Sequence, residues 1–230
     1  MKSLLAALAV LLAYVPSPSS LLKRAATRTM TLGKTKEVTL IGTLSVRAEA
    51  PRPAQLVLHF PLQCKLEGDG GLSLSVHGTP DKPSGTPEGT TGPALQLLQL
   101  ACPFLTYRGL PPEAAEGALK AAVTASGADI ATASALSRFG DRVVYVIGAA
   151  ARDLARPQLW LYKDTSAPAR LLAQGGADLR LLEYGTPASA SYFPRVVELW
   201  ESGQLAARFE AAEAKGARGA AEEEEDDSRE

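Results

Sequence analysis

Residues 142–174 read RVVYVIGAAARDLARPQLWLYKDTSAPARLLAQ. Short apolar runs in this stretch are separated by segments rich in Ala, Asp, Ser, Thr and Pro. Runs of Val, Leu and aromatic residues bounded by turn residues are typical of consecutive β-strands. A similar run precedes the stretch across Gly140-Asp141, and ADLRLLEY, YFPRVVELWE and QLAARFEAA follow it. The C-terminal half of the chain therefore predicts an antiparallel meander.

Several of these predicted strands are apolar on both faces. In 143–147 (VVYVI), 159–162 (LWLY) and 196–200 (VVELW), the odd-numbered and even-numbered residues both include large apolar side chains. A sheet with one face in water does not need the second apolar set. Two explanations stay open: both faces are covered, or one face curves around an apolar space.

The N-terminal half predicts three more strands. Apolar and polar residues alternate over 38–47, 56–66 and 72–77, which is the pattern of a strand with one face in water. GDGG at 68–71 predicts a hairpin turn between the last two of them.

Two helices and a loop separate the two groups of strands. Stretch 78–93 has Pro or Gly every few residues, so we expect a long loop there. The leucine-rich segment 94–102 predicts a short buried helix stopped by Pro103, and 111–127 predicts a second helix that begins at prolines. A short helix is also expected over 20–32. Strands grouped in this way, without βα alternation, predict an α+β fold with one long sheet and helices on one face.

The ends of the chain differ from its body. Residues 1–20 contain one basic residue, an apolar run and then Pro and Ser, which is typical of a secretory signal peptide and shorter than a membrane span of about 20 apolar residues. We expect cleavage between Ser17 and Ala26, and an uncleaved anchor is the alternative. Segment 215–230 includes seven acids in its last nine residues, which predicts a disordered tail. One domain over 21–214 remains.

Charge and motifs exclude several functions. The chain has 24 Lys and Arg against 25 Asp and Glu, so nucleic-acid binding is not expected. His59 and His77 are the only histidines, and HxH, HExxH, CxxC, GxSxG, GxxxxGK[ST] and GxGxxG are all absent. We therefore predict no catalytic residues, no metal site and no cofactor, and we expect that the protein is not an enzyme.

Cys64 and Cys102 are the only cysteines. An even number of cysteines in an exported chain favours a disulfide, which the chain-entropy estimate places at roughly 3–4 kcal/mol of stabilisation. A redox pair is the weaker alternative because the spacing is not CxxC.

The motifs of 142–214 resemble those of the LolA/LolB-like superfamily of outer-membrane lipoprotein-sorting proteins. The resemblance is carried by RVVYVIG (142–148), LWLYKDTSAPAR (159–170) and the strand pair in SYFPRVVELWESGQLAARFEAAEA (191–214). It implies a single curved antiparallel sheet, or half-barrel, whose short helical lid encloses an apolar cavity for acyl chains. It also implies a periplasmic location.

The resemblance suggests where cargo would lie. Segment 93–105 is the expected lid, and Arg47 is a candidate to hold a charged head group. The residues expected to line the cavity or lid are Leu95, Leu98, Phe104, Tyr145, Trp160 and Trp200.

The leading hypothesis is a periplasmic, non-enzymatic carrier or chaperone for lipidated or other apolar cargo. Its expected partners are lipoprotein or lipid acyl chains, with envelope proteins as further candidates, and the chain is not expected to be an integral membrane protein. The alternative is a structural or interaction module of the same fold whose interior is filled by its own side chains. An apolar cavity of several hundred Å³ would favour the carrier.

Overall fold

The computed structural model describes residues 15–27, 35–79, 82–89, 92–131, 134–185 and 193–218. In chain order the elements are α2 (Pro18–Thr27), β1 (Thr35–Val46), β2 (Arg52–His59), β3 (Gln63–Gly68), β4 (Leu72–Thr79), β5 (Lys82–Glu88), α3 (Pro93–Thr106), the 3-10 helix η2 (Tyr107–Gly109), α4 (Pro112–Ala125), β6 (Ala135–Phe139), β7 (Arg142–Ile147), β8 (Gln158–Tyr162), β9 (Pro168–Leu172), β10 (Ala177–Leu182), β11 (Val196–Glu201) and β12 (Gln204–Arg218).

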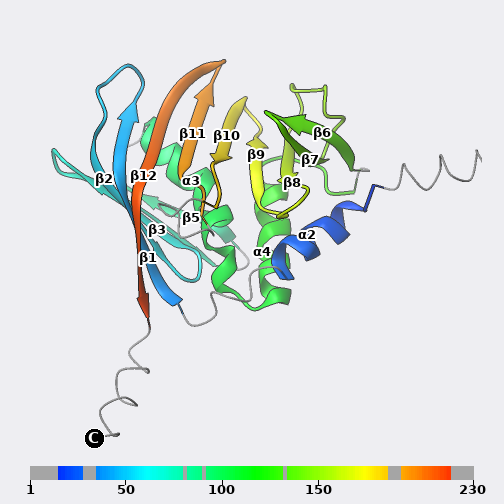
Figure 1. Cartoon of the computed structure of the whole chain (residues 1–230), viewed down its shortest axis with the longest axis horizontal. Coiled ribbons are helices and arrows are strands. Elements are labelled where there is room, and N and C mark those ends of the chain that lie inside the picture. Colours follow the sequence, from blue (N-terminus) through cyan, green and yellow to red (C-terminus); the bar gives the residue numbers. More distant parts are fainter. Residues whose placement is uncertain are drawn as a thin grey trace, which may run out of the picture.

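All these strands form one antiparallel sheet (Figure 1) in the order β5-β4-β3-β2-β1-β12-β11-β10-β9-β8-β7-β6. The first and last strands pair at its centre, from Thr35 opposite Arg218 to Val46 opposite Ala207. The α+β fold with a single curved sheet is therefore confirmed.

The ladder between β1 and β12 is irregular at Gly42, where the two backbones come very close. The register shifts between Ile41 and Gly42, and a Cβ atom at Gly42 would lie 1.9 Å from the carbonyl oxygen of Glu210. Only glycine allows this close approach of two backbones, which lets the sheet curve around the helices.

The helices gather against one face of the sheet. Leu97, Leu98 and Phe104 of α3 belong to the same buried apolar cluster as side chains from β1–β4 and β7–β12. Helix α2 packs beside α4 and buries Leu21 and Leu22 in that cluster. The disulfide between Cys64 of β3 and Cys102 of α3 is present, as predicted.

Stretch 56–66 is two strands instead of one. β2 ends at His59 and β3 begins at Gln63, and His59 and Gln63 face each other across the turn. The period-two pattern of apolar residues continues through this turn, so alternation alone conceals it.

The predicted loop 78–93 is wrong over most of its length. β5 pairs with β4 through Ser75 opposite Glu88 and Thr79 opposite Lys82. β5 ends the sheet, and an edge strand tolerates proline because one side of its backbone has no ladder to complete.

Pro103 does not stop α3, which continues to Thr106. Proline there costs the helix a hydrogen bond only near its end, and the Thr106 hydroxyl donates to the Cys102 carbonyl at 2.7 Å.

The predicted domain limits shift slightly. β12 runs to Arg218, so the first four residues of segment 215–230 are in the sheet. Residues 1–14 and 219–230 lie outside the described residues, as do 28–32 of the helix expected over 20–32. The described helix α2 begins at Pro18, inside the segment expected as a signal peptide.

Candidate functional site

Four of the six predicted cavity residues lie in the interior between helix and sheet. Leu95, Leu98 and Phe104 of α3 and Tyr145 of β7 are buried in one cluster. None of them lines the pockets that open beside Ala94, Arg47, Ile41 and Lys163. The side chains of α3 therefore fill the interior around these four residues.

Trp160 and Trp200 lie on the opposite face of the sheet, which corrects the prediction. Trp160 packs with Val144 and Tyr162 in a second apolar cluster, separate from the one that contains α3. The Trp200 indole N–H donates to Glu198 at 2.8 Å, and Arg180 stacks over its ring at 4.2 Å. Because adjacent strand residues point to opposite faces, Trp160 cannot share the face of Leu159 and Leu161.

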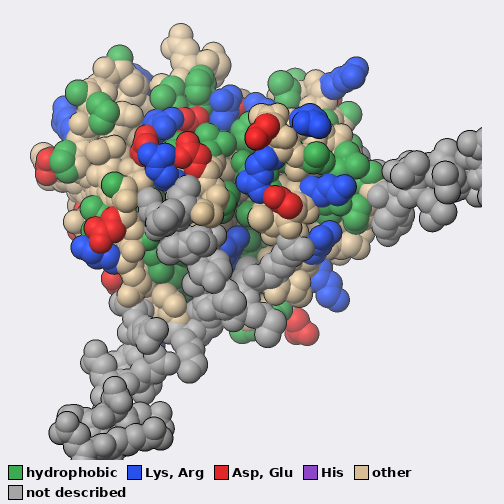
Figure 2. Space-filling model, in the orientation of Figure 1, with side chains coloured by type: hydrophobic (Ala, Val, Ile, Leu, Met, Phe, Trp, Pro, Cys, Tyr) green, Lys and Arg blue, Asp and Glu red, His purple; other side chains and the backbone are tan. Residues whose placement is uncertain are grey.

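A row of paired charges crosses this outer face. Arg170 donates to both carboxylate oxygens of Asp178 at 2.7 Å, and Arg180 approaches the same carboxylate at 2.9 Å. Arg208 contacts Glu198 and Glu210. Figure 2 shows acidic and basic side chains interleaved over the middle of the sheet. The arginines of this row are satisfied by carboxylates, so the row holds the sheet together instead of offering an anion site.

The ion pairs of this row also shift the pKa of Glu210. Hydrogen bonds from Arg208 hold the pKa of Glu210 below its ordinary value, and the charges of Arg208 and Arg195 act in the same direction. Glu210 is therefore ionised over the whole range in which ordinary carboxylates are.

The best candidate binding site is a mouth where the apolar interior reaches the surface. This pocket has a volume of about 320 Å³, at the lower end of the about 300–1,000 Å³ typical of ligand sites. Its apolar wall comes from three strands and a helix. The side chains of this wall are Leu44, Val46, Ala54, Leu72 and Ala94.

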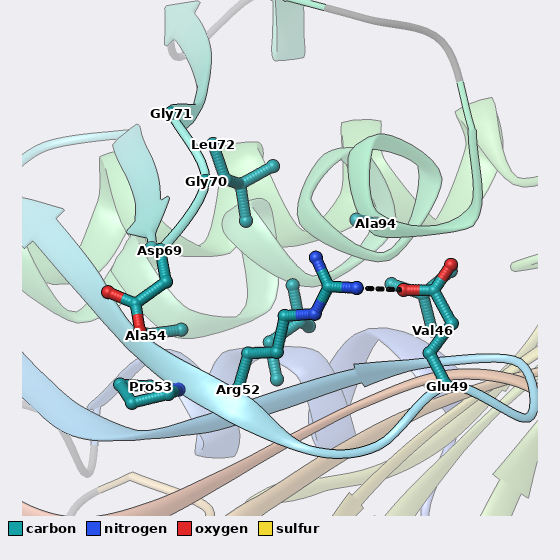
Figure 3. Close-up of a pocket in the computed structure, with 12 residues that line it drawn as sticks. Val46, Glu49, Arg52, Pro53, Ala54, Asp69, Gly70, Gly71, Leu72 and Ala94 are labelled. Carbon is teal, nitrogen blue, oxygen red and sulfur yellow. Dashed lines mark ion pairs between the residues drawn. The ribbon is translucent and has the colours of Figure 1, made fainter.

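Figure 3 shows how the elements build the mouth. Val46 ends β1, Ala54 lies near the start of β2, and Leu72 follows the tight turn between β3 and β4. Ala94 lies in the first turn of α3. Gly70 and Gly71 of the predicted hairpin turn have φ values of 77° and 81°, which glycine adopts without strain.

Charged side chains form the rim of this mouth. Arg52 and Glu49 form an ion pair at 3.5 Å, with 62% and 59% of their side chains exposed, and Asp69 stands across the opening (Figure 3). An exposed ion pair contributes about 0–1 kcal/mol. The pair therefore presents little barrier to a chain that enters between the side chains.

Arg47, the predicted head-group residue, does not line the mouth. It is exposed in the turn after β1 with φ 54°, and its backbone N–H donates to the Ala206 carbonyl at 2.8 Å. It borders a separate open hollow with Glu201 and Gln204.

Sequence reasoning missed Glu49, Arg52 and Ala94. The nearest feature that the sequence pattern identified was the GDGG turn at 68–71, and a turn motif does not indicate which residues lie opposite it. Among the described residues, no group of three His, Cys, Asp or Glu side chains is placed to hold a metal ion. None of the described helices is long and apolar enough to cross a membrane.

Comparisons with known proteins concern the fold. No family model and no curated protein matches the chain. A LolA superfamily protein from Nitrosomonas europaea is similar at TM-score 0.42 and 12% identity, over 87% of this chain and 94% of that one. A DUF1329 family protein from Desulfovibrio piger is similar at TM-score 0.46 and 8% identity, over 89% and 95%.

A chain of the MucA/MucB complex of Pseudomonas aeruginosa is similar at TM-score 0.29 and 16% identity, over 90% of this chain and 59% of that one. Scores and identities at this level say nothing about cargo or partners. The first of the three structures belongs to the superfamily that the sequence motifs resemble. The described strands of this chain form one open antiparallel sheet with helices on one face.

Proposed function

We propose that the protein is a non-catalytic binding protein that takes an apolar chain, such as the acyl group of a lipid or lipoprotein, into the mouth between α3 and β1–β4. The observation that carries this proposal is the wall of the mouth. Leu44, Ala54 and Ala94 are part of the buried core and also line a pocket open to the surface. An alkyl chain that enters there meets only apolar side chains beyond the charged rim.

Longer cargo requires the start of α3 to move. Leu95, Leu97 and Leu98 follow Ala94 into the core, and exposing these three leucines costs about 5–9 kcal/mol at about 1.5–3 kcal/mol each. A 16-carbon chain gains about 12 kcal/mol on burial at about 0.8 kcal/mol per methylene, whereas an 8-carbon chain gains about 6 kcal/mol. Long chains therefore offset the displacement of the helix and short chains do not.

The disulfide decides which part of α3 moves. Cys102 is bonded to Cys64 of β3 and both are fully buried, so the C-terminal part of the helix stays with the sheet. The part from Pro93 to Leu100 precedes this anchor and acts as the lid.

The disulfide also supports the proposed location. Structural disulfides form and persist in oxidising compartments, which agrees with a periplasmic protein exported by the signal-like segment 1–20. Arg52 lines the mouth whereas Arg47 borders a separate hollow, so Arg52 is the better candidate to hold a charged head group.

Fatty acids of increasing length test the proposal. We expect the dissociation constant, measured by displacement of a fluorescent fatty acid below micellar concentrations, to fall about fourfold per added methylene up to about 14–16 carbons. Ala94→Trp, which fills the mouth, should weaken binding at least tenfold. Ala125→Trp, at the exposed end of α4, is the matched control and should bind as the parent does.

Two results would contradict the proposal: no uptake at any chain length, or equal affinity of the parent and Ala94→Trp. The second candidate, an interaction module with a filled core, is favoured by the burial of Leu95, Leu98, Phe104 and Tyr145. It predicts the first of these two results.

A further inference from the structure

Among the described residues, the exposed large apolar side chains all lie on β6, β7 or the loop between β7 and β8. They are Leu136 of β6, Val143 of β7 and Leu154 of the loop between β7 and β8, with 43%, 37% and 53% of their surface exposed. Single exposed leucines are ordinary, but Leu136 and Val143 are exposed on the same face of two neighbouring strands, and adjacent exposed apolar side chains mark an interaction surface.

β6 ends the sheet at this place. Among the described residues only β7 pairs with it. Phe139 and Arg142 flank the two-residue turn at Gly140-Asp141, and such a turn is closed by a hydrogen-bonded pair. Because pairs alternate along an antiparallel ladder, the N–H and C=O groups of Leu136 and Arg138 point to the open edge.

The two faces of β6 differ in chemistry. Phe139 packs edge-on against Trp160, with ring centroids 5.7 Å apart, on the outer face. Leu136 and Arg138 lie opposite Tyr145 and Val143, on the inner face. A strand added beside β6 would meet an aromatic ring on one side and a leucine and a guanidinium on the other.

The charge around this edge is basic. Arg138, Arg152, Arg156 and Lys163 form no ion pair within the described part of the chain. Lys163 and Val143 border a hollow of about 390 Å³ together with the ion-paired Arg142 and Asp164. Figure 2 shows Lys and Arg side chains with apolar surface between them where β6–β8 lie. The unpaired carboxylates nearby are fewer, those of Asp141 and Asp153.

The loop that carries Leu154 is held in a fixed shape. The N–H of Asp153 donates to the Ala150 carbonyl at 2.8 Å, and the Gln158 side chain donates to the Asp153 carbonyl at 2.8 Å. Gln158 is fully buried. The loop therefore presents Leu154 between Arg152 and Arg156 without needing to order on binding.

We propose that the open edge of β6 binds an extended, acidic segment of a partner protein, which adds to the sheet as a further strand. Main-chain hydrogen bonds to Leu136 and Arg138 supply the affinity, and alternate side chains supply the specificity. Acidic residues of the segment face Arg138, and apolar residues face Phe139. This surface is distinct from the mouth under α3.

A pair of model peptides tests the proposal on the full chain. A fluorescein-labelled peptide of four Val-Glu repeats should bind, by anisotropy, at least tenfold more tightly than one of four Val-Lys repeats. Leu136→Pro removes the outward N–H without touching the ladder to β7 and should abolish binding. Leu136→Ala removes the same side chain, keeps the N–H and should weaken binding only severalfold.

Arg138→Glu keeps the backbone and should reverse the preference between the two peptides, which keeps the test decisive if Leu136→Pro fails to fold. Equal loss in the Pro and Ala variants would overturn strand addition. Binding to phosphatidylglycerol vesicles without binding to the Val-Glu peptide would overturn the protein partner, and no preference between the peptides would overturn the role of charge.

Discussion

Opening the Cys64–Cys102 disulfide should destabilise the protein by about 4 kcal/mol. The two cysteines are 38 residues apart, and the chain-entropy estimate for a closed loop of this length is about 4 kcal/mol at 25 °C. The perturbation is the double substitution Cys64→Ala/Cys102→Ala, compared with the parent in the presence and absence of reductant. Both side chains are fully buried, so the cavity left by the two sulfur atoms adds to the loss.

Urea unfolding followed by circular dichroism measures this effect. With a slope of about 2–3 kcal/mol per molar urea, the midpoint should fall by about 1.5–2 M in the double variant. The variant itself should be insensitive to reductant, which serves as the control. A loss below about 1 kcal/mol would refute the view that the disulfide fixes α3 to β3, because the helix would then be held by packing alone.

Three further predictions concern the outer face and α2. Asp178→Ala leaves the Arg170 side chain, which is only 12% exposed, without its carboxylate partner, and should lower the free energy of unfolding by about 3–5 kcal/mol. Glu213→Ala, in the exposed pair with Lys215, is the control and should lower it by less than about 1 kcal/mol in the same urea assay. Because the folded-state pKa of Glu210 is lowered, its contribution to the stability of the fold is present above the ordinary glutamate pKa and is lost as pH falls below about 4.5. The thermal midpoint should therefore fall less between pH 5 and pH 3 in Glu210→Gln than in the parent. An equal fall in the two proteins would disprove this contribution. Leu22→Ala should cost about 2–5 kcal/mol, and Lys23→Ala on the exposed side of α2 should change stability by less than about 0.5 kcal/mol; equal effects would mean that α2 is not part of the folded domain.

The helices and strands that could be predicted from the sequence are those whose residues all favour the same secondary structure. β7–β12 and α4 follow from apolar runs with turn residues or prolines at their limits, and the Cys64–Cys102 bond follows from the number of cysteines. β5 was missed because Pro83, Gly85 and Pro87 argue against any strand, and only its place at the edge of the sheet permits one.

The candidate site was predictable only in part. Two-sided apolar strands are explained equally by two covered faces or by one face curved around an apolar space. Alternation does not say which face meets α3, so the assignment of Trp160 and Trp200 to the inner side was wrong. The mouth depends on three segments, 44–54, 68–72 and 94, that meet through the curvature of the sheet. That curvature depends on the close crossing of β1 and β12 at Gly42, which no local pattern reveals.

Photo-crosslinking with a palmitic acid analogue that carries a diazirine near its methyl end tests the central claim most directly. After irradiation and peptide mapping, the account predicts labels on the wall of the mouth and beneath the start of α3, among Leu44, Ala54, Leu72 and Leu95–Leu98. Labels confined to the β6–β8 end of the sheet, or no labelling above that of the Ala94→Trp variant, would contradict it.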